Sequence, residues 1–114
     1  MAQYLVQVSY TPEAWASMVD NPQNRQELVR PAVESLGGKF EHCWMCFGEY
    51  DLVGIVEFPG NIDAGAFSIG VSAKGAVRAF KTTPLLTMDE SVQVMRRAKQ
   101  LAYTPPQGQT AGVR

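Results

Sequence analysis

The residues best suited to chemistry gather in one short stretch, His42-Cys43-Trp44-Met45-Cys46, which Tyr50 and Asp51 follow closely. Imidazole and carboxyl groups can transfer protons, and a C-x-x-C pair can bind metal or form a redox disulfide. On a strand, however, residues three apart point to opposite faces and lie roughly 10 Å apart, too far for a disulfide. We therefore expect structural cysteines, no metal and no cofactor.

A hairpin must position these residues. Its strands, 39–47 and 50–58, are rich in aromatic and β-branched residues, and Gly48-Glu49 would form a two-residue turn because glycine readily adopts positive φ. This register pairs Trp44 with Val53, His42 with Ile55, and Cys46 with Asp51. One face would then carry an imidazole, an indole, a thiol and a carboxylate, a mixture typical of a small-molecule pocket.

The candidate catalytic residues are Asp51, His42 and Tyr50, with Asp51 or His42 moving a proton. Each also has a commoner structural role: Asp51 in a turn, His42 in a hydrogen-bonded core or interface, and Tyr50 in packing. The candidate ligand-binding residues are Trp44, Cys46, Lys81 and Arg78. Of these, Lys81 and Arg78 could hold an anion or could be solvated charges at a sheet edge.

The elements before the hairpin have local start and stop signals. Residues 3–10 alternate in the period of two that predicts a strand. Thr11 and Pro12 start a helix, and a second helical piece over 23–36 contains Pro31, which should kink it or start a new turn.

After the hairpin, a helix is predicted over 62–74, capped by Asn61 or Asp63. One of its stripes is apolar: Ile62, Ala66, Ile69, Gly70 and Ala73. Gly65 and Gly70 permit close approach of a neighbour. The near absence of charge indicates that this helix is covered on more than one side.

The last elements are a strand over 76–83, stopped by Pro84, and a helix that a Thr87–Glu90 capping box starts. This helix should run to about residue 102, and we expect four of its residues to face inward: Val94, Met95, Ala98 and Leu101. The chain would form one domain over 1–102, with a disordered tail over 103–114.

The element order is therefore β-α-β-β-α-β plus a C-terminal helix, which predicts a ferredoxin-like α+β fold. Its strands carry large apolar residues on both faces, as Tyr4 and Leu5 do on the first strand. An antiparallel sheet with one wet face should alternate more cleanly. We therefore expect the sheet to pair with that of a second copy, giving a homodimer or higher homo-oligomer.

Four separated segments, 4–13, 32–39, 47–51 and 75–87, resemble the GYD-domain family, and the likeness extends over about residues 2–100. The 47–51 segment, Phe47-Gly-Glu-Tyr-Asp51, matches the turn motif after which the family is named. The resemblance implies a fold similar to dimeric α+β barrels, and it brings no established activity or catalytic residues. The chain departs from the family pattern at His42, Cys43 and Cys46.

Composition excludes several classes of function. Ten Lys and Arg residues nearly balance eleven Asp and Glu residues, giving a net charge of −1, so no basic face for nucleic acid is expected. No apolar run approaches the ~20 residues that span a membrane, and no signal peptide is recognised, so we expect a cytoplasmic protein.

Two functional hypotheses remain. The preferred one is a protein that binds a small, largely apolar molecule between sheet and helices, or that serves as an assembly module. The alternative is a cofactor-independent enzyme, similar to monooxygenases or isomerases among dimeric α+β barrels, in which Asp51 or His42 moves a proton in an apolar cavity.

Overall fold

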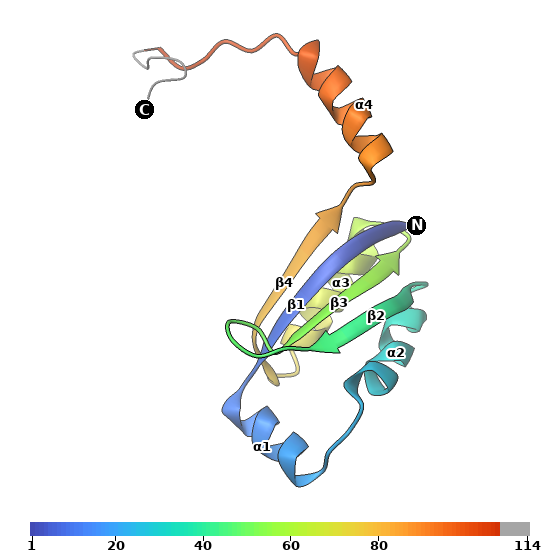
Figure 1. Ribbon diagram of the computed structural model, residues 1–114, viewed down its shortest axis with the longest axis vertical. Helices are drawn as coiled ribbons and strands as arrows, with labels where there is room; N and C mark the ends of the chain where they lie inside the picture. Colours follow the sequence, from blue (N-terminus) through green and yellow to red (C-terminus); the bar gives the residue numbers. More distant parts are fainter. Residues whose placement is uncertain (108–114) are drawn as a thin grey trace.

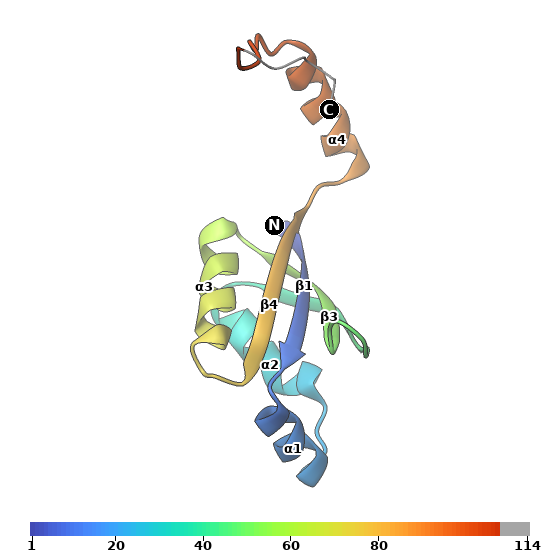
Figure 2. The same cartoon turned by 90° about the vertical axis from the view of Figure 1, so that its left-hand side faces the viewer.

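The computed structural model describes residues 1–107, which form one antiparallel sheet with helices. The elements are β1 (Ala2–Tyr10), α1 (Pro12–Asp20), α2 (Arg25–Ser35), β2 (Lys39–Met45), β3 (Leu52–Phe58), α3 (Asn61–Ser72), β4 (Val77–Leu85) and α4 (Met88–Lys99). The strand order is β2-β3-β1-β4, and α2 and α3 cover the same face of the sheet (Figures 1 and 2). The predicted ferredoxin-like α+β fold is confirmed.

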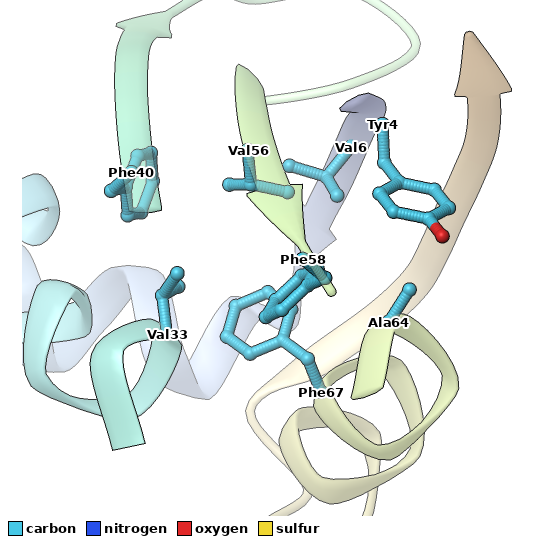
Figure 3. Packing of buried hydrophobic residues seen from close by; sticks show 8 residues of the cluster. All are labelled: Tyr4, Val6, Val33, Phe40, Val56, Phe58, Ala64 and Phe67. Atoms are coloured by element: carbon cyan, nitrogen blue, oxygen red, sulfur yellow. The ribbon is translucent and has the colours of Figure 1, made fainter. Parts of the chain in front are cut away.

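The core lies between this covered face and the two helices. Alternate residues of β1 are buried there, and they meet Val33 from α2 and Phe67 from α3 (Figure 3). The aromatic rings of Phe58 and Phe67 lie 5.5 Å apart between their centroids. Successive side chains of a strand point to opposite faces of the sheet. Leu5 and Gln7, which alternate with the buried residues of β1, therefore lie on the outer face.

Local signals set the N-terminal ends of three helices, and the caps of α1 and α4 are those predicted. The Thr11 side chain accepts a hydrogen bond from the Ala14 N–H at 3.1 Å, and Asn24 caps α2 in the same way. The Thr87–Glu90 capping box at the start of α4 is confirmed, with both of its hydrogen bonds formed. These contacts satisfy N–H groups that a helix leaves unpaired in its first turn.

The predicted two-residue turn of the hairpin is wrong. β2 ends at Met45 and β3 begins at Leu52, so residues 46–51 form the connection. Gly48 does adopt a positive φ of 131°. Cys46 and Asp51, which the predicted register pairs, share one backbone hydrogen bond, from the Cys46 N–H to the Asp51 carbonyl at 2.8 Å. Other groups of the connection bond to β1: the Glu49 carbonyl accepts from the Ser9 hydroxyl, and the Asp51 N–H donates to the Val8 carbonyl.

Within the ladder, the predicted pairings of Trp44 with Val53 and His42 with Ile55 are confirmed. A bulge between Phe40 and His42 shifts the register. It turns Glu41 to the outer face, where its carboxylate accepts a hydrogen bond from the Gln3 amide at 2.8 Å. The bulge therefore interrupts the regular alternation of side chains that a plain hairpin would have.

One expectation for α3 also fails, and a single chain does not test the other. Gly60, rather than Asn61 or Asp63, is the N-cap residue, because Asn61 instead accepts a hydrogen bond from the Tyr4 hydroxyl. The residues buried against the sheet are Ala64 and Phe67. The apolar stripe faces outward, with Ile62 88% and Ile69 73% exposed. Apart from the backbone of α3 itself, no atom of residues 1–107 lies within 4 Å of a Cβ built on Gly65 or Gly70.

β4 continues through Pro84 to Leu85, although we predicted that the proline would stop it. β4 is an edge strand that pairs only with β1. At an edge, the missing N–H of proline can face solvent without breaking a ladder.

α4 does not pack inward. It extends away from the sheet beyond the end of β4 (Figures 1 and 2), and none of its residues is buried. Met95, predicted to face inward, is 61% exposed, and Val94 and Leu101 are exposed as well. The radius of gyration is 18.5 Å, whereas a compact domain of this length should have about 13 Å.

Residues 103–107 contain no helix or strand, and the rest of the predicted tail, 108–114, lies outside the described residues. Within 1–107, no helix has the length and apolar character needed to cross a bilayer.

Candidate functional site

Asp51 lies where the hairpin connection meets the end of β1 and the start of α1. Its Oδ2 atom accepts two hydrogen bonds, from the Tyr10 N–H at 2.8 Å and from the Trp15 indole N–H at 3.1 Å. The Trp15 ring in turn packs edge-on against Tyr10, with centroids 5.5 Å apart. The carboxylate therefore joins three segments, and it faces the helix-covered side of the sheet.

A pocket of about 400 Å³ opens beside Asp51, between α1, the start of α2 and the sheet. We call it the α1 pocket. Most of its wall is apolar, from Trp15, Met18, Val19, Met45 and Leu52. Its polar groups include the Tyr10 hydroxyl, the Cys43 thiol, the Arg25 guanidinium and the Asp51 carboxylate.

A second pocket, of about 250 Å³, adjoins the first and lies between α2, α3 and the sheet. We call it the α2–α3 pocket. It shares Tyr10, Arg25 and Leu52 with the α1 pocket. Its remaining wall is almost wholly apolar, with residues such as Val29, Phe40, Phe67, Val71 and Phe80, and with Lys74 at one side. The two pockets together form one mostly apolar region, with the polar groups of Tyr10 and Arg25 at the boundary between them.

Arg25 lies on the shared wall and has no acidic partner among residues 1–107. Its Nη1 donates to the Gln23 side chain at 2.6 Å, while its Nε is buried without a hydrogen-bond partner. In the part of the chain that the structure describes, the one ion pair joins Arg30 with Glu27. A buried polar group without a partner is uncommon in proteins and costs free energy.

Burial also acts on two other polar groups of the pockets. It raises the pKa of the Tyr10 hydroxyl, although the neighbouring Arg25 guanidinium opposes that rise. Burial likewise raises the pKa of the Cys43 thiol, and nearby Cys46 adds to the effect. Both groups therefore stay neutral near pH 7, so they can donate hydrogen bonds to a ligand without adding charge.

His42 and Asp51 are not brought together. His42 lies on the outer face of the sheet, where its ring stacks on that of Trp44 with centroids 5.5 Å apart. Asp51 precedes β3, and its carboxylate points toward α1 rather than continuing the alternation of the strand. Asp51 and His42 thus lie on opposite faces of the sheet, and the predicted transfer of a proton by one or the other stays a prediction.

The other predicted site residues are scattered. Tyr50 contributes its carbonyl, which accepts a hydrogen bond from the Cys46 thiol at 3.3 Å. Trp44 is 54% exposed on the outer face, Lys81 pairs with Gln7 across the β4–β1 ladder, and Arg78 is exposed on β4. None of Trp44, Cys46, Lys81 and Arg78 lines either pocket. Their roles in binding stay predictions.

The cysteines are both free and half-buried. Among residues 1–107, no cluster of three or more His, Cys, Asp or Glu side chains could hold a metal ion.

Sequence reasoning missed Tyr10, Trp15, Arg25, Cys43 and Lys74 as pocket residues. The alternation of β1 does predict that Tyr10 shares a face with Val6 and Val8. Nothing local places Arg25 there, because its position depends on how the segment between α1 and α2 packs against the hairpin.

Comparison with known proteins agrees with the family resemblance. No curated protein matches the chain. Among solved structures, the crystal structure of FFRP-DM1 is similar, with 15% sequence identity and a TM-score of 0.47 over 75% of this chain and 100% of that one. The model of the family described as GYD domain matches residues 4–95. The chain therefore belongs to the GYD-domain family.

Proposed function

We propose that this protein binds a small, largely apolar molecule between its sheet and its helices. The observation that carries the proposal is the pair of adjoining pockets, of about 400 and 250 Å³, with mostly apolar walls. Ligand sites in proteins have this composition, with a few polar groups that fix the orientation of the ligand. Here Tyr10, Arg25 and Asp51 are the polar groups placed to do so.

The test uses N-phenyl-1-naphthylamine, a neutral apolar dye that fluoresces in apolar surroundings. We expect the wild-type protein to bind it. Val71→Trp, which fills the α2–α3 pocket, should weaken this binding at least about tenfold. Ser72→Trp is the control, because Ser72 is exposed on the same helix and lines neither pocket.

Equal binding by the wild type and both variants would place the dye elsewhere and would contradict the proposal. Native mass spectrometry of the protein purified from cells gives an independent check. A retained small molecule would add to the 12.5 kDa mass of the chain.

We propose further that the chain assembles with a second copy of itself through the outer face of the sheet, α4, or both. The observation that favours assembly is α4, whose apolar residues are exposed although the helix is well capped. An amphipathic helix derives most of its stability from packing its apolar side against another surface.

Charge also favours a second copy as the partner. On the outer face, the hydrogen bond with Glu41 raises the pKa of Glu57, while the hydrogen bond from Gln3 lowers the pKa of Glu41. Two carboxyl groups thus lie together on this face. The last turn of α4 carries Arg96, Arg97 and Lys99. These cations complement the acidic pair when they come from another copy.

Sedimentation velocity tests the assembly. We expect a species of at least twice the 12.5 kDa chain mass at micromolar concentration. Ile55→Glu, on the outer face, should shift the protein toward monomer, whereas Ser35→Glu, exposed on α2, should not. A wild-type monomer at these concentrations would overturn this second proposal and leave the first intact.

A further inference from the structure

The charges around the α2–α3 pocket have one sign. Arg25 and Lys74 are the charged residues of its wall, and no Asp or Glu lines it. The α1 pocket, by contrast, has both Arg25 and Asp51 in its wall. A molecule held in the α2–α3 pocket therefore meets two positive groups and an otherwise apolar surface.

Arg25 has an edge without a charged acceptor, although the neutral Tyr10 hydroxyl lies beside the guanidinium. Its Nη1 is engaged with Gln23, which leaves the edge of the guanidinium that carries the buried and unpartnered Nε. Guanidinium groups bind carboxylates through paired N–H groups with fixed geometry, and such charge-assisted hydrogen bonds are stronger than neutral ones. A carboxylate at this edge would supply the missing acceptor.

Asp51 does not fill that role. Its Oδ2 is already shared by the Tyr10 N–H and the Trp15 indole, and no ion pair joins Asp51 with Arg25 within the described range. The positive charge of Arg25 on the shared wall is therefore not balanced by Asp51, and a ligand could balance it.

We infer that the ligand is an amphiphilic anion, a carboxylate with an apolar body. Its carboxylate lies against Arg25, with Lys74 as a second cation, and its body occupies the α2–α3 pocket. The inference depends on the proposed binding of an apolar molecule and adds the chemical class of that molecule.

The experiment compares octanoate with 1-octanol, which share a chain length and differ in the charged group. Each competes with N-phenyl-1-naphthylamine for the wild-type protein, and its affinity follows from the loss of dye fluorescence. We expect octanoate to bind at least about tenfold more tightly than octanol, as a charge-assisted hydrogen bond in a buried site allows.

Arg25→Gln should remove this preference, so that octanoate and octanol bind the variant equally within about twofold. A circular dichroism spectrum and a thermal unfolding transition like those of the wild type show that the variant is folded. Arg30→Gln is the matched control, because Arg30 lies on the same helix, pairs with Glu27 and lines neither pocket. It should keep the wild-type preference.

The outcomes separate the two proposals. If octanoate and octanol bind the wild type equally, the anionic class is wrong and the apolar site stands. If Arg30→Gln loses the preference as Arg25→Gln does, general surface charge explains it and the inference fails. If the dye does not bind, or if neither octanoate nor octanol displaces it, the proposed site itself is wrong.

Discussion

The two faces of the sheet differ in how much of their apolar surface the chain itself buries. On the helix-covered face, Tyr4 and Val56 are buried beneath α2 and α3. On the outer face, Trp44 remains half exposed beside the partly buried Ile55. The outward-facing apolar residues of α3 and the apolar side of α4 are exposed to solvent as well. The chain thus completes one apolar layer by itself and leaves several apolar surfaces exposed.

The largest difference should follow from removing an aromatic ring on each face. Phe58→Ala, in the core, should lower the free energy of unfolding by about 3–5 kcal/mol because it leaves a cavity. Trp44→Ala should lower it by less than about 1 kcal/mol at dilutions where the chain is monomeric. Urea unfolding of both variants measures this. Equal losses at high dilution would mean that a single chain already buries the outer face.

A charge on α4 should weaken assembly more than stability. Met95→Glu puts a carboxylate on the apolar side of the helix and should raise the dissociation constant of the assembly at least about thirtyfold, as loss of a central interface contact does. Gln93→Glu adds the same charge on the polar side and should leave the constant nearly unchanged. Sedimentation equilibrium measures both constants, and equal constants would remove α4 from the interface.

A methyl group at Gly38 tests the tight packing of the covered side. The Cβ of alanine there would lie 2.5 Å from the Glu57 carbonyl oxygen and 2.7 Å from the Phe58 ring. Overpacking of this kind typically costs about 1–3 kcal/mol. Thermal unfolding of Gly38→Ala should show that loss. An unchanged Tm would indicate that the contact between β3 and the start of β2 is loose.

The same substitution on the open side of α3 should have the opposite sign. No atom of the described chain lies within 4 Å of a Cβ at Gly70. Gly70→Ala should therefore stabilise the monomer by about 0.5–1 kcal/mol, the helix preference of alanine over glycine. If thermal unfolding shows a gain in the monomer and a loss in the assembled protein, a second copy packs closely on this helix.

The contrast between the faces also explains what the sequence could predict. The alternation of β1, the Thr11 cap and the Thr87–Glu90 capping box depend on neighbours within a few residues, and each was predicted correctly. The fold class followed from the order of such elements. These features need no knowledge of distant contacts.

The wrong predictions all depended on distant contacts. α3 could bury either of two apolar stripes, and the sheet selects the one that contains Phe67. Asp51 leaves the alternation of β3 because β1 and α1 offer it hydrogen-bond donors. Arg25 is unremarkable in the sequence, and it becomes a candidate site residue only where α2 meets the hairpin. The inward direction predicted for α4 assumed a surface within the same chain.

The smallest effect should come from high pH, and it concerns only the covered side. The pKa values of Cys43 and Tyr10 are raised above their ordinary values of 9.0 and 10.0, mainly by burial. Well below pH 9 both groups are protonated in the folded and the unfolded chain, so neither makes stability depend on pH. Above those values the unfolded chain loses the protons first, and stability falls as the pH rises through the raised pKa values.

The free energy of unfolding, measured in urea at pH 7 and at about pH 10.5, should fall between these two pH values. The fall should be smaller for Tyr10→Phe and for Cys43→Ala than for the wild type. Tyr103→Phe is the control, because this tyrosine is exposed beyond α4. If the control flattens the pH dependence as much as Tyr10→Phe does, ionisation at exposed positions explains the loss. The covered face would then contribute nothing particular to it.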